Sequence, residues 1–208
     1  MSAGKQDTRV VIIDSGGANL ASVQYALSRL GSDARVTTDA KEIAAASHVI
    51  LPGVGAAGHA MARLNALGLP DVLRELRVPV LGICLGMQLL FESSAEGDVG
   101  CLGLLPGRIE RLVAPGLTVP HMGWNTCKQE RPSPLFVGLT ERDYFYFVHS
   151  FALPMTASTV ASTTHGQVFS AAVQAGHIHG VQFHPERSGA VGARLLANFL
   201  SLNAEATS

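Results

Sequence analysis

The stretch VPVLGICLGMQLL, residues 78–90, decides the fold because it changes periodicity within a few residues. Its first part, VPVLGI, is a short apolar run typical of a buried strand, and LGMQLL then continues as a helix. Between them stands Cys84, with Gly82 and Gly86 two residues away on either side. A sharp strand-to-helix turn of this form presents a nucleophile, and the glycines avoid clashes where the backbone comes close.

A cysteine in such a turn lies at the N-terminus of a helix, where the positive end of the dipole favours the thiolate. The backbone N–H of Leu85 would then point at a developing oxyanion. The alternative is a structural cysteine in the core that glycines flank by chance. A nucleophile would need an imidazole base, and the base would need a group that orients it.

The segment GVQFHPE, residues 180–186, offers both groups. His184 follows an apolar strand, and Glu186 stands two residues later, on the same side if the segment is extended. Pro185 restricts the backbone between them. We therefore expect Glu186 to bond one ring nitrogen of His184 while the other nitrogen faces Cys84.

Two alternatives apply to this segment. His184 can be an ordinary bonded or exposed histidine, or it can join His177 and His179 in a metal cluster. No further carboxylate or thiolate stands at ligand spacing, so we expect no metal site. We interpret His177 and His179 as surface residues near a turn.

A glycine-rich loop, LPGVGAAG at residues 51–58, follows another predicted strand. Backbone N–H groups of Gly53, Val54 and Gly55 can reach an oxyanion with no side chain in the way, which would supply a second donor. The alternatives are an ordinary strand-to-helix turn or a phosphate nest. The loop lacks the Lys-Ser/Thr pair of a Walker loop, which argues against a nucleotide.

Outside these motifs, strands and helices alternate up to residue 97, which predicts a mostly parallel sheet with helices on both faces. Beyond it, a segment rich in Pro, Gly and β-branched residues predicts a smaller antiparallel β portion. We expect one α/β domain over residues 1–208, with a disordered tail at 1–8. Strands are predicted at 10–14, 34–38, 48–53, 78–83, 144–151, 159–164, 169–174 and 179–186, and helices at 19–30, from Asp39, at 56–68, 85–92 and 189–202.

Composition excludes several function classes. The 208 residues are 47% hydrophobic, and 15 Lys and Arg against 16 Asp and Glu give a net charge of −1. Without a basic stripe, nucleic acid and anionic membranes are not expected as partners. The longest apolar run, Val78–Phe91, is interrupted and falls short of the roughly 20 residues that span a bilayer. The three cysteines show no CxxC spacing and the N-terminus no signal, so we expect a cytoplasmic protein.

Taken together, the motifs identify a family. The chain resembles the class I glutamine amidotransferases, with GICLGMQ as the nucleophile segment and FHPE as the His-Glu segment. More narrowly, it resembles the glutaminase subunits of imidazole glycerol phosphate synthases of histidine biosynthesis. The order LPGVG, GICLGMQLLFE, PHMGWN, YFYFVHSF, GVQFHPERSG covers nearly the whole chain, and PHMGWN with YFVHSF is specific to those subunits.

The resemblance implies an activity. Cys84 would attack the carboxamide of L-glutamine, His184 would protonate the departing ammonia, and water would release glutamate from a thioester. No cofactor is implied. By family position, the oxyanion is surrounded by Gly53, Val54 and Leu85, and glutamine is held by Gln88 and the backbone around His149, Ser150 and Phe151.

The resemblance also implies a partner. The ammonia would pass to a (β/α)8-barrel synthase subunit, which forms imidazole glycerol phosphate and an aminoimidazole carboxamide ribotide. Low basal activity is expected of the chain alone, because the PGVG loop would need rearrangement by the partner. The partner would be met by Asn19, His121, Met122, Trp124, Asn125, Tyr146 and Arg187.

The match has two departures, both expected near the partner surface. The first-strand loop reads Asp14-Ser15-Gly16-Gly17-Ala18-Asn19, where many members carry a glycine in place of Ala18, and Arg187 replaces a frequent lysine. Three alternatives stay open: a glutaminase of another pathway, a stand-alone cysteine hydrolase, and a binding module without catalysis.

Overall fold

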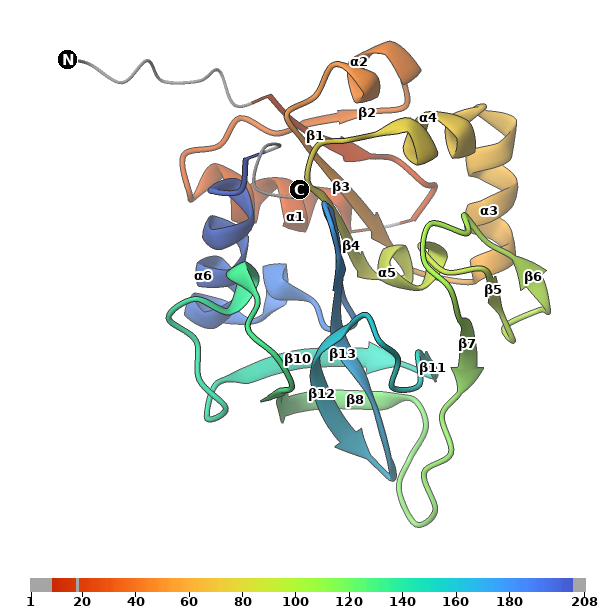
Figure 1. Cartoon of the computed structure of the whole chain (residues 1–208), viewed down its shortest axis with the longest axis vertical. Coiled ribbons are helices and arrows are strands. Elements are labelled where there is room, and N and C mark those ends of the chain that lie inside the picture. Colours follow the sequence, from red (N-terminus) through yellow and green to blue (C-terminus); the bar gives the residue numbers. More distant parts are fainter. Residues whose placement is uncertain (1–8, 18, 204–208) are drawn as a thin grey trace.

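An eight-stranded sheet forms the centre of the protein in a computed structural model, which describes residues 9–17 and 19–203. The tail predicted at residues 1–8 lies outside the described residues. The strand order is β2-β1-β3-β4-β14-β13-β12-β9 (Figure 1). The five strands from β2 to β14 run parallel to one another, and β13, β12 and β9 continue the sheet antiparallel. The strands are β1 (Val10–Ile13), β2 (Arg35–Thr37), β3 (His48–Gly53), β4 (Val80–Cys84), β9 (Lys128–Gln129), β12 (Thr159–His165), β13 (Gln167–Ala175) and β14 (Ile178–Val181).

Helices cover both faces of this sheet. Side chains alternate along β1, so that Val10 and Ile12 join one core cluster while Val11 and Ile13 join the other. Helices α1 and α6 pack on the first face, and α2 to α5 pack on the second (Figure 1). The helices are α1 (Leu20–Ser28), α2 (Ala40–Ala44), α3 (Ala57–Ala66), α4 (Leu69–Glu75), α5 (Leu85–Leu89) and α6 (Gly189–Leu200).

The helix predicted over residues 56–68 is followed directly by one that the sequence did not predict. Gly68 has φ +66° and separates α3 from α4. Pro70 lies in the first turn of α4, where a proline is tolerated because its missing N–H would have no partner there. The short helix predicted from Asp39 is confirmed. The Asp39 carboxylate accepts hydrogen bonds from the backbone N–H groups of Lys41 and Glu42.

The smaller β portion consists of two further sheets, one in the lower half of Figure 1 and one along its right side; pairing in them is antiparallel except between β5 and β7. One pairs β8 with β10, and the other has the order β11-β7-β5-β6. The predicted fold class, a mostly parallel sheet with helices on both faces and a smaller antiparallel portion, is confirmed. The strands of these sheets are β5 (Ser93–Ser94), β6 (Val99–Gly100), β7 (Arg108–Arg111), β8 (His121–Thr126), β10 (Tyr144–His149) and β11 (Phe151–Ala152).

The prediction that His179 lies at the surface is wrong. Strand β14 runs between β4 and β13, so both of its faces are covered, and His179 is only 1% exposed. Its ring packs against Phe199 of α6, with 6.5 Å between the ring centroids. Burial, aided by the nearby His177, lowers the pKa of His179 to about 4, so the ring is neutral at pH 7.

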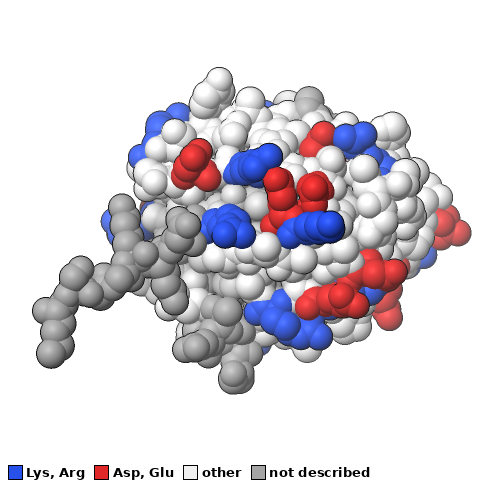
Figure 2. Space-filling view, turned by 90° about the horizontal axis from the view of Figure 1, so that it is seen from above, with Lys and Arg blue, Asp and Glu red and all other residues white. Residues whose placement is uncertain are grey.

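Among residues 9–17 and 19–203, no helix is long and apolar enough to cross a bilayer. On the face seen in Figure 2, Lys and Arg side chains lie interspersed with Asp and Glu. Such a face has no large field of one sign that would attract a polyanion.

Candidate active site

Cys84 ends β4 and precedes the first residue of α5, with φ 54° and ψ −111°. This conformation is rare for a residue with a side chain and is held by the packing around it. A Cβ on Gly82 would lie 2.7 Å from the backbone of Met87, and a Cβ on Gly86 would overlap the carbonyl of Leu51. The glycines on either side are therefore sterically required, as the sequence predicted.

His184 and Glu186 form a buried pair. Nδ1 of His184 donates to Oε1 of Glu186 over 2.7 Å, and both side chains are almost fully excluded from solvent. Burial disfavours the charged ring, but the nearby Cys84 and the hydrogen-bonded Glu186 outweigh it and raise the pKa of His184 to about 10. The imidazolium form is thus favoured beside a cysteine sulfur.

The local geometry of this pair differs from the prediction of an extended segment. Strand β14 ends at Val181, and residues Pro185–Arg187 form a 3-10 turn. The turn, rather than strand alternation, brings the carboxylate of Glu186 back to the ring of His184. The predicted strand over residues 179–186 is correspondingly too long.

Asn19 makes a contact with this pair that the sequence did not predict. It was expected at a partner surface, but its Nδ2 donates over 2.6 Å to Oε1 of Glu186, the oxygen that also accepts from His184. Asn19 adopts φ 89° where α1 begins. The neighbouring departure from the family pattern, Ala18, lies outside the described residues.

The glycine-rich loop lies beside the nucleophile. Strands β3 and β4 pair in parallel, with Gly53 directly opposite Cys84. The loop is also tied to the turn after β1, where Ser15 Oγ donates to the Pro52 carbonyl over 3.0 Å. A Cβ on Gly17 would lie 3.0 Å from Cγ2 of Val54, so this turn packs closely against the loop.

A pocket of about 700 Å³ joins these groups. It is lined by every residue predicted to bind glutamine or to catalyse except two: Gly53, which pairs with Cys84, and Glu186, which bonds His184. A pocket of this size suits a small-molecule substrate. The predicted residues that line it are Val54, Gly55, Cys84, Leu85, Gln88, His149, Ser150, Phe151 and His184, together with Asn19 and Arg187 from the predicted partner surface.

Glu96 also lines the pocket and was missed by the sequence analysis. Its Oε2 accepts from the backbone N–H of Ala57 at the start of α3, which fixes the carboxylate. A carboxylate there can bind the ammonium group of an amino acid. Glu96 stands in a charged stretch outside the recognised motifs, and nothing in its spacing marks it.

His149 belongs to a chain of hydrogen bonds with one direction. The Phe151 carbonyl can only accept, so His149 Nδ1 donates to it over 2.9 Å and His149 Nε2 must accept. His121 Nδ1 then donates to that nitrogen over 3.1 Å, which leaves His121 Nε2 to accept from Asn125 over 3.4 Å. Burial dominates the lowering of both pKa values, to about 3 for His149 and about 4 for His121.

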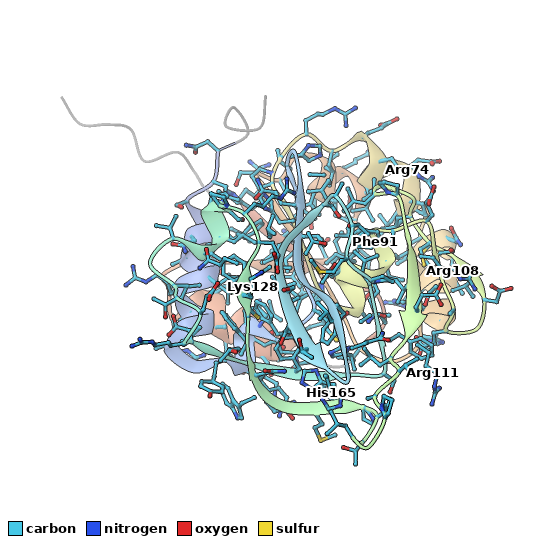
Figure 3. The ribbon with its side chains drawn as sticks, turned by 60° about the horizontal axis from the view of Figure 1, so that its bottom comes forward. Arg74, Phe91, Arg108, Arg111, Lys128 and His165 are labelled. Carbon is cyan, nitrogen blue, oxygen red and sulfur yellow. The ribbon has the colours of Figure 1, made fainter. Side chains whose placement is uncertain are left out.

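This chain corrects the expected position of one residue. His121 was expected at the partner surface, but it is only 4% exposed. Asn125 is half-buried, and its Nδ2 also donates to the Thr164 carbonyl over 3.0 Å, so its place at the partner surface stays a prediction. The ring of His121 also stacks on His165, with 4.3 Å between centroids. His165 is the last residue of β12, at the turn to β13, in the lower part of Figure 3.

The other predicted interface residues form a mostly exposed patch that Arg187 connects to the pocket. Met122 and Trp124 alternate with the inward residues of β8 and are 64% and 56% exposed. The Trp124 ring packs edge-on against Tyr146, and the Arg187 guanidinium lies 4.3 Å from the Tyr146 ring centroid. Arg187 also lines the pocket, so we name these four residues the mouth patch.

No metal site accompanies these groups in the part of the chain that the structure describes, where no three His, Cys, Asp or Glu side chains gather as ligands. Cys84, Cys101 and Cys127 are all free thiols.

Solved structures with similar folds include one described as a glutamine amidotransferase. It has a TM-score of 0.72 and 22% identity, over 92% of this chain and 97% of that one. A glutamine amidotransferase from Thermotoga maritima has a TM-score of 0.60 at 18% identity, over 86% of this chain and 76% of that one. At these identities the likeness extends to the fold alone.

Sequence comparison is more specific. The chain is 59% identical over 197 residues to the imidazole glycerol phosphate synthase subunit HisH of Xanthomonas axonopodis pv. citri, which covers 94% of this chain and 98% of the relative. It is 58% identical to the subunit of the same description from Xylella fastidiosa strain Temecula1, over 95% and 99% of the two chains. The family model for glutamine amidotransferase class-I matches residues 11–202. The chain therefore belongs to the class-I glutamine amidotransferases and, within them, to the family of imidazole glycerol phosphate synthase HisH subunits.

Proposed function

We propose that this protein is the glutaminase subunit of an imidazole glycerol phosphate synthase, hydrolysing L-glutamine to glutamate and ammonia. The observation that carries the proposal is a strained Cys84 that shares one pocket with a His184 bonded to Glu186. A cysteine, an imidazole and an orienting carboxylate are what thioester chemistry on an amide needs. Nearly full-length identity to HisH subunits supports the pathway.

Glutamine would bind with its carboxamide at the nucleophile. Glu96 offers a carboxylate for the α-ammonium group, and the backbone at Ser150 and Phe151 lines the same pocket. The N–H of Leu85, at the start of α5, would receive the developing oxyanion, with the loop at Val54 and Gly55 as the second source of donors.

Hydrolysis would proceed in two steps. In the first, the Cys84 sulfur attacks the carboxamide carbon, and the carbon–nitrogen bond breaks as His184 gives its proton to the leaving nitrogen. In the second, His184 takes a proton from water, which attacks the thioester and expels the thiolate. Glu186 holds the ring and favours its charged form in the first step.

The product explains why such an enzyme would need a partner. Ammonia released into neutral water becomes ammonium and is no longer a nucleophile. A (β/α)8-barrel synthase subunit docked on the mouth patch would receive it directly, and Arg187, which lines the pocket and lies over the Tyr146 ring, favours that position. Exposed Trp, Tyr, Met and Arg side chains are the types that protein interfaces enrich.

Three further predictions accompany this function. We expect low basal activity, because the loop after β3 would need rearrangement by the partner to supply its donor. We treat residues 1–208 as one catalytic domain. The free thiols Cys84, Cys101 and Cys127 fit a location in the cytoplasm, where thiols stay reduced.

The experiment measures glutamate release from L-glutamine by the chain alone and with the barrel synthase plus its ribotide ligand. We expect activity near background for the chain alone and a strong rise in the complex. Cys84→Ala removes the sulfur and is expected to abolish activity. Cys101→Ala, which removes a half-buried thiol outside the pocket, is the matched control and keeps full activity.

Other outcomes separate the alternatives. Free hydrolysis of glutamine that ignores the barrel synthase would support the nucleophile and overturn the pathway. Hydrolysis of esters or peptides in preference to glutamine would favour a stand-alone cysteine hydrolase. Full activity in Cys84→Ala would overturn the whole proposal.

A further inference from the structure

Gln182 is a buried side chain that the mechanism above does not use. It follows directly after β14, whose last residue Val181 pairs with Ile83, so Gln182 lies beside Cys84. It is 0% exposed, and its Nε2 lies 3.8 Å from the Cys84 sulfur, within hydrogen-bond reach for sulfur. A buried amide next to a nucleophile can act on the charge of that nucleophile.

The orientation of this amide follows from its neighbours. The Phe151 carbonyl only accepts, so the atom of Gln88 that approaches it to 2.8 Å must be the nitrogen. The same nitrogen uses its second hydrogen on Gln182 over 3.0 Å, and the atom it meets there must be the oxygen. The Gln182 nitrogen therefore faces the sulfur, since a flipped amide would leave Gln88 with no acceptor.

The two protonation states of Cys84 have different partners. As a thiol, the sulfur can donate to the Val148 carbonyl, which lies 3.8 Å away. As a thiolate it has no hydrogen to give, and that carbonyl repels it. The Gln182 N–H then remains on the sulfur as a donor, in addition to the charged ring of His184.

We propose that Gln182 is a further catalytic residue, whose side-chain N–H binds the Cys84 thiolate. Gln88 fixes its orientation, so one chain of amides joins the glutamine-binding wall to the nucleophile. The inference rests on the proposed glutaminase function and deepens it.

The role applies to both steps of the reaction without moving a proton. Gln182 holds the thiolate before the carbon–sulfur bond forms, and it receives the thiolate again when water breaks that bond. The proton goes from His184 to the departing nitrogen in the first step and from water to His184 in the second. Gln182 is neither oxidised nor reduced, and it exchanges no group.

A purely structural amide would fill the same space, so the test must report on the sulfur. We would measure the rate of Cys84 alkylation by iodoacetamide against pH, following the Cys84 peptide by mass spectrometry in the full chain. Gln182→Met keeps the length of the side chain and removes the donor. The same substitution at Gln174 of β13, which bonds Ser133 away from the pocket, is the matched control.

We expect the pH midpoint of alkylation to rise by about one unit in Gln182→Met, so that the rate at pH values below the midpoint falls about tenfold. The plateau rate at high pH stays unchanged, as does the profile of Gln174→Met. The other ionisable groups of this pocket are His184, His149, Glu96 and Arg187, with Glu186 behind His184, and all are kept in both variants. A midpoint equal to that of the unmodified chain overturns the proposal.

A second measurement needs no folded variant at position 182. In the ¹⁵N-labelled full chain, the side-chain amide signal of Gln182 should shift with pH at the midpoint of Cys84 alkylation. The shift should vanish in Cys84→Ala. An amide signal that ignores the titration of the sulfur overturns the inference. The glutaminase function would fail separately, as absent glutamate release in the complex, whatever the amide does.

Discussion

Two glycine-containing turns meet at the nucleophile, and they are built in opposite ways. In the turn after β4, added Cβ atoms at Gly82 and Gly86 would run into backbone. In the turn after β3, Gly55 has φ +92°, and an added Cβ would meet nothing within 4 Å. The turn after β4 is sterically closed around the sulfur. In the turn after β3 the position of Gly55 is open, while Gly53 packs against Gly86 and Val54 packs against Gly17. The contrast is between tight packing at the nucleophile and conformational freedom at Gly55.

The largest effect is expected from Gly86→Ala, which breaks the closed turn. The new methyl group would overlap the Leu51 carbonyl, so α5 and β3 would have to move apart. We expect a loss of more than about 3 kcal/mol in the free energy of unfolding, measured by urea denaturation. Gly100→Ala, where a Cβ meets nothing within 4 Å, should be nearly neutral. Equal stability of the two variants would show that the turn after β4 has room for a side chain.

Glu186→Gln removes the negative charge beside His184 while keeping the shape of the side chain. We expect kcat of the complex to fall by about 10²–10⁴-fold at neutral pH, because the ring loses its anionic partner. The raised pKa of His184 stabilises the fold fully below about pH 6.5, and this stabilisation is lost as pH rises towards about 10. In Glu186→Gln, thermal unfolding between these pH values should therefore depend less on pH. An unchanged kcat would remove Glu186 from the mechanism.

His121→Phe tests the hydrogen-bonded chain that ends at the pocket residue His149. Phenylalanine can keep the stacking on His165 but leaves His149 Nε2 buried without a donor. We expect a loss of about 1–3 kcal/mol in stability and a higher KM for glutamine with a smaller change in kcat. His165→Phe keeps the hydrogen-bonded chain and serves as the control. A KM equal to that of the unmodified complex would show that the chain does not position the pocket.

Gly55→Ala probes the open turn. The strain of φ +92° costs a residue with a side chain about 1 kcal/mol, with no steric term added. Gly31→Ala carries similar strain at φ +78°, also with open space, but far from the pocket. Both variants should lose similar stability in thermal denaturation, while only Gly55→Ala lowers kcat of the complex, by about tenfold. Equal activity in the two would mean that the open turn does not need its freedom.

The smallest effect at neutral pH is expected from His179→Leu, within the shared sheet and away from both turns. The pKa of His179 is lowered from 6.5 to about 4, so the unfolded chain binds a proton that the folded chain does not, and stability falls as pH drops through this range. The variant should be more resistant to urea by about 2 kcal/mol at pH 5 and almost unchanged at pH 7.5. A constant difference across pH would contradict the neutral ring.

The two turns also mark what could be predicted from sequence. The turn after β4 was predictable because the steric requirement for its glycines arises within one short segment of sequence. The pairing of His184 with Glu186 was predicted, but with the wrong local geometry. Two residues in a 3-10 turn can have the same sequence spacing as two residues on one face of a strand, so the spacing alone could not distinguish the two. Glu96 was missed because only tertiary folding brings it to the pocket.

Other failures have equally specific causes. His179 looked superficial because its neighbours suggest a turn, and only the strand order shows that β14 is covered on both faces. His121 was assigned to the partner surface by resemblance, although strand alternation in HMGWNT would have turned it inward and left Met122 and Trp124 outside. Helix α4 was hidden by Pro70, a residue that usually ends helices.

The hydrogen-bonded chain from Asn125 to the Phe151 carbonyl has a consequence for how this protein can change. All its hydrogen bonds are donated in the same direction. Replacing or reversing one member would therefore leave a buried donor or acceptor on its neighbour without a partner. Asn125, His121 and His149 are therefore expected to be replaced together or not at all. Related chains that differ at one of these positions should differ at the others, and transplanting a single member between them should cost more than transplanting the set.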